Sequence, residues 1–202
     1  MNINYIEAST LVDIDRNILD NSHLTPAQYE IIRQVIYHTG DFEYSSLIKF
    51  ANEPLLKGYK ALISGIPIIV DVPEIQVSIV PRLQQTFSNP VYCCATTVNK
   101  PEKTKTKAAL GLETIAKQHE RAIVIIGQDR IALKVLSHLA KSQKVNPSLA
   151  IVTTPIFIEQ DSHEYFKTAA FPIIYVDSSK GSPTVASAIF NALVNLSSRV
   201  SN

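Results

Sequence analysis

The sequence predicts an α/β protein in which helices cover both faces of an open, mostly parallel β-sheet. Short apolar runs rich in β-branched residues alternate with longer stretches of helical periodicity. The runs are apolar throughout rather than at every second residue, which is typical of strands buried on both faces. Repeated alternation of strands and helices favours a doubly wound sheet. The predicted strands span residues 66–70, 91–95, 122–127, 148–153 and 172–176.

The helices are predicted from their periodicity and from the residues at their ends. The clearest helix follows Thr25, whose hydroxyl can accept from free amides of the first turn. Pro26 suits the first helical position and Gln28 completes a capping box. Its apolar residues recur at spacings of three and four, and Gly40 is a suitable end. The other predicted helices span residues 73–87, 106–119, 128–141, 161–170 and 183–196, and the last is expected to fray at its end.

Length and composition indicate a globular chain, which we expect to form one domain over residues 1–202. Hydrophobic residues make up 46% and charged residues 18%, which excludes a largely disordered chain. Lys and Arg number 19 against 18 Asp and Glu, so the sequence lacks the basic excess of nucleic-acid-binding domains. No apolar run approaches the roughly 20 residues needed to cross a bilayer, and the first residues lack the features of a signal peptide. We therefore expect neither a nucleic acid nor a membrane as a partner.

Cysteine and histidine usage argues against disulfides and metal sites. Cys93 and Cys94 are adjacent in a predicted strand, so their side chains are expected on opposite faces as buried, inert thiols. Two such thiols fit a reducing compartment, and we expect a cytoplasmic protein. The histidines show no tight pairing at ligand spacing, so no metal site is predicted.

The densest polar cluster follows the first predicted helix, over residues 37–43. His38 would lie in the last turn, where the negative end of the helix dipole favours the imidazolium. Asp41 and Glu43 would act in the same direction. A histidine so placed is a candidate proton donor near neutral pH. The alternative is a histidine that only satisfies carbonyls at the helix end.

Two further segments are candidates for binding anions. Lysines at 100, 103, 105 and 107 lead into a helix that begins near Thr106 and Lys107, where free amides could add to an anion site. The alternative is a solvated, exposed loop over residues 98–107. After the last predicted strand, Lys180 and Gly181 precede a helix and could hold a carboxylate or a phosphate, although the segment is not a Walker sequence.

Five short motifs follow one another in a distinctive order. They occupy residues 36–43, 65–72, 106–112 and 122–127, followed by Lys180-Gly181 before residues 191–193. This succession resembles the precorrin-8X methylmutase family, also called precorrin isomerase, over about residues 6–196. The order of the motifs is more specific than any one of them.

The resemblance implies a homodimeric α/β enzyme, an isomerase of cobalamin (vitamin B12) biosynthesis. Family members move a methyl group from C11 to C12 of precorrin-8X and give hydrogenobyrinate; in the anaerobic branch, cobalt-precorrin-8 gives cobyrinate. No separate cofactor is implied. Such a substrate is a large macrocycle with many carboxylate arms. It requires a broad groove, cationic and amide groups at the rim, and one proton donor near the ring.

The resemblance also identifies candidate site residues. The family's catalytic histidine stands four residues before the aspartate that matches Asp41; here Tyr37 holds that position and His38 follows it. We hypothesise that His38 is the proton donor, with Tyr37 lining the same pocket and Asp41 orienting the donor. The residues predicted to contact the substrate or its carboxylates are Asp41, Thr106, Lys107, Lys180 and Gly181.

Two other kinds of function remain open at this point. The altered position of the histidine would suit a relative that binds a tetrapyrrole or another polycarboxylate without isomerising it. A different small-molecule α/β enzyme would need a pocket with other converging groups.

Overall fold

The centre of the fold is a six-stranded sheet, seen in a computed structural model that describes residues 5–18, 22–98, 104–155 and 160–201. The strands are β1 (Ile48–Ala51), β2 (Ile68–Val70), β3 (Val91–Cys93), β4 (Ile123–Ile126), β5 (Leu149–Val152) and β6 (Ile173–Val176). Their order is β1-β6-β5-β4-β2-β3. Strands β2 to β6 run parallel, whereas β1 pairs antiparallel with β6 at one edge. The predicted open, mostly parallel sheet is confirmed.

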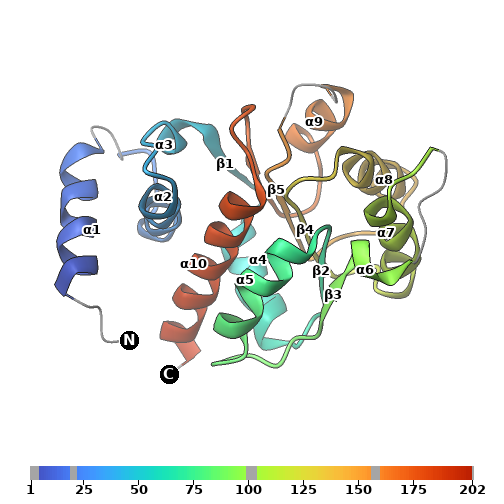
Figure 1. Cartoon of the computed structure of the whole chain (residues 1–202), viewed down its shortest axis with the longest axis horizontal. Helices are drawn as coiled ribbons and strands as arrows, with labels where there is room; N and C mark the ends of the chain where they lie inside the picture. The colour runs from blue at the N-terminus through green and yellow to red at the C-terminus, as the bar shows by residue number, and fades with distance from the viewer. Residues whose placement is uncertain (1–4, 19–21, 99–103, 156–159, 202) are drawn as a thin grey trace.

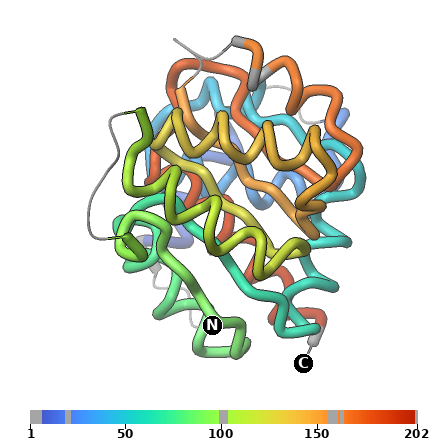
Figure 2. The backbone as a smooth tube through the Cα atoms, turned by 90° about the vertical axis from the view of Figure 1, so that its right-hand side faces the viewer, coloured from blue at the N-terminus to red at the C-terminus, as the bar shows by residue number. Residues whose placement is uncertain are grey.

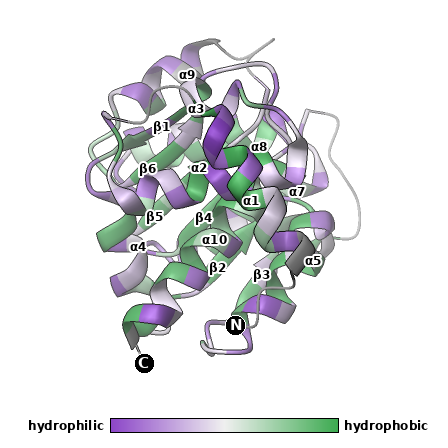
Figure 3. Ribbon diagram, turned by 90° about the vertical axis from the view of Figure 1, so that its left-hand side faces the viewer, coloured by the Kyte–Doolittle hydropathy of each residue, from purple (hydrophilic) through white to green (hydrophobic). Residues whose placement is uncertain are grey.

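Alternate residues of each strand enter two separate cores, one on each face of the sheet. In β4, Ile123 and Ile125 join one cluster of buried residues, whereas Val124 and Ile126 join the other. Consecutive side chains of a strand point to opposite faces, so a strand that is apolar throughout needs a cover on both. Figure 3 shows these central strands in the hydrophobic colour, with α1 (Tyr5–Asn17) in front of them carrying a hydrophilic segment.

Helices cover both faces, as predicted. With α1 on one face lie α2 (Pro26–Thr39), α3 (Tyr44–Leu47), α4 (Pro54–Ile63), α5 (Pro73–Leu83) and α10 (Pro183–Ser201). On the other face lie α6 (Cys94–Thr97), α7 (Lys107–Gln118), α8 (Arg130–Lys141) and α9 (Gln160–Lys167). Figure 1 shows α2 and α10 on one side of the strands and α7 and α8 on the other, and Figure 2 looks onto the side that α7 and α8 cover. Within the described ranges, no helix is both long and apolar enough to span a membrane.

The ends of α2 follow the predicted capping pattern. The Thr25 hydroxyl accepts from the Gln28 amide at 3.3 Å, and the Gln28 side chain accepts from the Thr25 amide at 2.9 Å. Gly40 ends the helix in the left-handed conformation, with φ of 69°, and its N–H donates to the Ile36 carbonyl. Helix α2 packs along α10, so its last turn has a defined place relative to the sheet.

Some elements differ from the sequence predictions. The strand predicted over residues 91–95 ends at Cys93, because Cys94 begins the short helix α6. Both thiols are nevertheless buried and fall in different core clusters, as predicted. The structure adds α1, α3, β1 and α4, and α10 continues to Ser201, beyond the predicted end at residue 196.

Helices α6 and α7 approach each other closely at Gly111. A Cβ atom at Gly111 would lie 2.1 Å from the carbonyl oxygen of Cys94, a distance that two such atoms cannot adopt. Glycine in the middle of α7 therefore sets how closely this helix packs against the end of β3.

We expect Gly111→Ala to destabilise the protein by about 1–3 kcal/mol, as overpacking does. Helix propensity alone would predict the opposite effect, because alanine is the better helix former by about 1 kcal/mol. A loss of stability would therefore report the close contact. The control is Lys117→Ala, at an exposed position of the same helix; it should change the free energy of unfolding by less than about 0.5 kcal/mol. Urea denaturation measures both, and a Gly111→Ala protein as stable as the wild type would contradict the close backbone contact.

Candidate functional site

The carboxyl ends of the parallel strands meet at one edge of the sheet, which is where ligands bind to open α/β sheets. Asp71 follows β2, Gly127 follows β4 and Thr153 follows β5, while Lys180 lies in the loop between β6 and α10. The end of α2 reaches the same edge, because Asp41 contacts Lys180. The structure thus brings together two segments that the sequence analysis selected separately.

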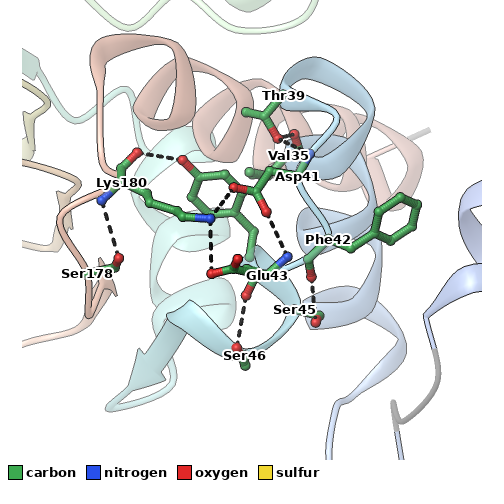
Figure 4. Close-up of polar contacts among 10 residues, drawn as sticks. Val35, Thr39, Asp41, Phe42, Glu43, Ser45, Ser46, Ser178 and Lys180 are labelled. Atoms are coloured by element: carbon green, nitrogen blue, oxygen red, sulfur yellow. Dashed lines mark hydrogen bonds and ion pairs between the residues drawn. The ribbon is translucent and has the colours of Figure 1, made fainter.

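The turn after α2 is held by its own polar side chains. The Thr39 hydroxyl donates to the Val35 carbonyl at 2.8 Å and accepts from the Asp41 amide at 3.3 Å. The Asp41 carboxylate in turn accepts from the Glu43 amide at 2.9 Å. These short-range bonds direct the carboxylates of Asp41 and Glu43 to the same side of the turn, as Figure 4 shows.

Lys180 joins this turn to the loop after β6. Its Nζ atom lies 2.8 Å from Asp41 Oδ2 and 3.0 Å from Glu43 Oε2 (Figure 4). Its backbone is fixed as well: the Tyr44 hydroxyl donates to the Lys180 carbonyl at 2.5 Å, and the Lys180 amide donates to Ser178 Oγ at 3.3 Å. One lysine therefore ties together two segments from opposite ends of the chain.

The charges of this cluster stabilise one another. The hydrogen bond from Lys180 lowers the pKa of Asp41 below its usual value, and the amide of Glu43 adds to the effect. The same contacts with Asp41 and Glu43 raise the pKa of Lys180. With one ammonium and two carboxylates, the cluster carries a formal charge of about −1 when all three groups are ionised. Lys180 is thus neutralised by its own chain.

Tyr37 and His38 lie in the last turn of α2, and both are exposed. His38 Nδ1 lies 2.7 Å from the Gln34 carbonyl oxygen. Since a carbonyl can only accept, Nδ1 carries the hydrogen, and Nε2 is left to exchange a proton. The two rings pack edge to face, with centroids 5.3 Å apart. The helix remains regular through these residues, which places their side chains about 100° apart around its axis.

A pocket of about 330 Å³ opens beside Lys180, between the loop after β4 and the start of α10. Its described lining residues are Gly127, Gln128, Arg130, Pro155, Gly181, Ser182 and Pro183. Gly181 is fixed closely against β5, because a Cβ atom there would lie 1.7 Å from the Thr153 carbonyl oxygen. The Thr153 hydroxyl also donates to the Ser182 carbonyl at 2.8 Å. Of the predicted site residues, Gly181 lines this pocket.

Asp71 holds the opposite wall of the pocket and was not identified from the sequence. Its carboxylate is fully buried and accepts the backbone N–H groups of Gly127, Gln128 and Asp129 at 3.1, 2.8 and 2.8 Å. Burial raises the pKa of Asp71, and the three amides oppose that rise. The available signal was an acidic residue directly after a fully apolar strand, at the edge where sites form.

Thr106 and Lys107 begin α7 at the same edge but on the other face of the sheet. The Thr106 hydroxyl caps the helix by accepting from the Ala109 amide at 3.1 Å, while Lys107 is exposed. Nearby Lys105 is paired with both oxygens of Glu113 at 2.7 Å. No described contact joins this helix start to Lys180. The loop lysines at positions 100 and 103 lie outside the described residues.

Metal ligands do not converge at this edge. In the part of the chain that the structure describes, no group of three or more His, Cys, Asp or Glu side chains could hold a metal ion. Burial raises the pKa of the Cys94 thiol well above its usual value, and the negative charge of Asp71 adds to this. That thiol therefore stays protonated and unreactive.

Comparison with known proteins gives matches along almost the whole chain. A family model described as precorrin-8X methylmutase matches residues 5–196. The cobalt-precorrin-8 methylmutase of Synechocystis is 30% identical over 203 residues, covering 92% of each chain. That of Methanocaldococcus jannaschii is 32% identical over 170 residues, covering 81% of this chain and 77% of its own. The solved precorrin-8X methyl mutase of Thermus thermophilus superposes with a TM-score of 0.85 at 25% identity, covering 98% of this chain and 99% of that one.

We expect Asp71→Asn to destabilise the protein by about 1–3 kcal/mol. The NH₂ group of asparagine would replace one carboxylate oxygen, so at least one buried backbone N–H would lose its acceptor. The backbone amides of Gly127 and Gln128 should also exchange hydrogen faster. Asp129→Asn is the matched control, since asparagine caps a helix as well as aspartate does and the Asp71 bonds remain. Urea denaturation and amide exchange measure the effects. Unchanged protection of both amides in Asp71→Asn would show that the carboxylate does not hold this loop.

The Lys180 contact should be visible in the titration of Asp41. Because the folded pKa of Asp41 is lowered, the contact stabilises the protein above the ordinary carboxyl pKa, and this contribution is lost as pH falls through the lowered value. We therefore expect Lys180→Met to raise the Asp41 pKa and to reduce stability at neutral pH more than at low pH. NMR titration of the carboxyl carbon measures this, with Lys105→Met as the control. An Asp41 pKa unaffected by Lys180→Met would contradict the ion pair.

Proposed function

The chain belongs to the precorrin-8X methylmutase family, and on that premise we propose that it moves a methyl group from C11 to C12 of a precorrin-8 macrocycle. Membership makes it an isomerase of cobalamin biosynthesis, an intramolecular methyl transferase. The relatives from Synechocystis and Methanocaldococcus jannaschii are named cobalt-precorrin-8 methylmutases, which favours the cobalt-bearing substrate and cobyrinate as the product. The observation that carries the proposal is the Lys180–Asp41 contact, which fixes the turn bearing Tyr37 and His38 at the carboxyl edge of the sheet.

In the proposed reaction, His38 donates a proton to the conjugated ring. Its Nδ1–H donates to the Gln34 carbonyl, so the transferred proton is the one on Nε2 of the imidazolium. Protonation withdraws electron density from the ring and favours migration of the methyl group to C12. The proton then returns to Nε2, so no atom is gained or lost and no cofactor is consumed. Tyr37 lies beside this imidazole and lines the same surface.

The substrate carboxylates require cations that the chain itself leaves free. Lys180 already contacts two carboxylates, so it would bind a substrate arm only by exchanging one of them. Lys107 and Arg130 are exposed at the same edge, and neither makes an ion pair with a described residue. We assign substrate arms to these two side chains and to the amides near Gly181, with Thr106 fixing the start of α7. Lys180 and Asp41 then act chiefly by positioning the donor turn.

A second function is favoured by one specific observation. The resemblance places Tyr37 where the family has its catalytic histidine, and a phenol is a weaker acid than an imidazolium. A protein with this substitution could bind the tetrapyrrole and not isomerise it. The homodimer and the cytoplasmic location that the sequence suggested stay predictions.

Turnover of cobalt-precorrin-8 by the wild-type protein and by the His38→Ala and Tyr37→Phe variants distinguishes the isomerase from the relative that only binds the tetrapyrrole. General acid catalysis contributes about 10²–10⁴ in rate, so we expect His38→Ala to lower kcat by that factor and to retain corrinoid binding. Tyr37→Phe should have a smaller effect. The absorption spectrum reports binding and methyl migration in the same sample, and Lys117→Ala is the surface control.

Each outcome of this experiment decides one point. Full turnover by His38→Ala would show that His38 is not the donor. Binding without turnover by the wild-type protein would favour the non-isomerising relative and contradict the proposed activity. Failure to bind any corrinoid would contradict both.

A further inference from the structure

A second and larger pocket lies at the opposite edge of the sheet, where the parallel strands begin. Its volume is about 840 Å³, which is within the range of small-molecule sites. One wall is a face of α4, whose lining residues recur at spacings of three and four: Glu53, Lys57, Lys60, Ala61 and Ser64. The other wall consists of the segments that lead into β2, β4, β5 and β6. Strands of four residues, about 13 Å long, separate this pocket from the candidate site.

The charges that line this pocket are mostly positive and are not compensated by the chain. The lining contains three cationic side chains, Lys57, Lys60 and Arg121, and one acidic side chain, Glu53. Among the described residues, none of these three cations forms an ion pair, whereas Lys180 at the other edge contacts two carboxylates. An anionic ligand could therefore bind here without displacing an internal partner.

The walls are also held in place before any ligand binds. Asn52 Nδ2 donates to the carbonyls of Ala169 and Phe171 at 2.7 and 2.9 Å, which joins the start of α4 to the segment before β6. Asn52 and Glu53 both adopt the left-handed conformation, with φ of 62° and 56°. Consecutive residues of this kind are strained, and such strain clusters at ligand sites. On the other wall, the Ser148 hydroxyl donates to the Arg121 carbonyl at 2.6 Å.

Apolar side chains form part of the same lining. They are Ile66, Pro147, Phe171 and Pro172, which come directly before strands or within two residues of one. Pro147 and Phe171 are largely buried by the chain, whereas Ile66 and Pro172 are half-buried. A simple inorganic anion would leave the open parts of Ile66 and Pro172 in water, whereas a carbon skeleton carrying several anionic groups would cover them. Charge and shape thus select the same class of ligand.

We propose that this pocket binds a small organic polyanion, a compact carbon skeleton with two or more carboxylate groups. The site is separate from the methyl transfer at the carboxyl edge and does not depend on it. Lys57, Lys60 and Arg121 pair with the carboxylates, Glu53 opposes them, and the apolar residues contact the skeleton. Binding should weaken as salt concentration rises, because the pocket is open to solvent.

Calorimetric titration of the intact protein with benzene-1,3,5-tricarboxylate tests this site. We expect Lys60→Ala to weaken binding about tenfold, which corresponds to one lost charged contact of about 1.4 kcal/mol. Glu53→Gln should tighten binding several-fold, a change that misfolding cannot mimic. Lys117→Ala, an exposed lysine on the other face, is the charge-matched control and should bind like the wild type.

The location is tested by NMR, through the amides of Asn146 and Ser148 at the pocket wall. Their shifts should move on titration in proportion to the calorimetric occupancy. Equal weakening by Lys60→Ala and Lys117→Ala would overturn the proposal, because binding would then follow net charge. Shifts confined to the carboxyl edge, or inorganic phosphate binding as tightly as the tricarboxylate, would overturn it as well.

Discussion

Burial of the sheet on both faces is the constraint on which the rest of the structure depends. Strands such as β4 and β5 are apolar throughout and fully buried, so helices must cover both sides and no polar group can approach along the faces. Polar chemistry is thereby confined to the two edges where strands begin and end. The buried carboxylate of Asp71 shows the same constraint at one residue: it is tolerated because three backbone amides point at it. Those amides belong to the loop that walls the pocket at the carboxyl edge, so satisfying a buried charge also shapes the site.

The two edges use their cations differently. At the carboxyl edge, Lys180 is held by Asp41 and Glu43, and its charge holds two segments of the chain together. At the opposite edge, where the parallel strands begin, Lys57 and Lys60 form no ion pair with a described carboxylate and remain available to a ligand. A lysine that is neutralised internally contributes geometry, whereas one that is not contributes electrostatic attraction. The distinction depends on the fold, because all of these lysines look alike in the sequence.

The sequence predicted those features that arise from local patterns. The five parallel strands and the capping box of Thr25 and Gln28 depend on neighbouring residues. The burial of Cys93 and Cys94 in different clusters was also predicted, although Cys94 lies in α6 and not in the strand. Strand β1 was missed because it is a short edge strand whose apolar run is broken by the exposed Lys49. Helix α4 was missed because it begins after a left-handed glutamate without a side-chain cap. The pairing of Lys180 with Asp41 joins residues 139 positions apart, and no local pattern reports it.

The end of α2 bears directly on the displaced histidine. A one-residue step on a helix turns the side chain by about 100°, so His38 could take the place of a histidine at position 37 if the last turn unwound. The turn does not unwind: Gly40 closes it with a bond to the Ile36 carbonyl, and Thr39 is bonded to Val35. If His38 is the donor, as we propose, its imidazole must reach the substrate from an intact helix end. Its Nδ1 is anchored on the Gln34 carbonyl and its ring packs edge to face against Tyr37, so Nε2 is the ring nitrogen without a described partner. One anchored nitrogen and one free nitrogen suit the general acid that we propose, one place beyond the position that the resemblance implies for the family's histidine.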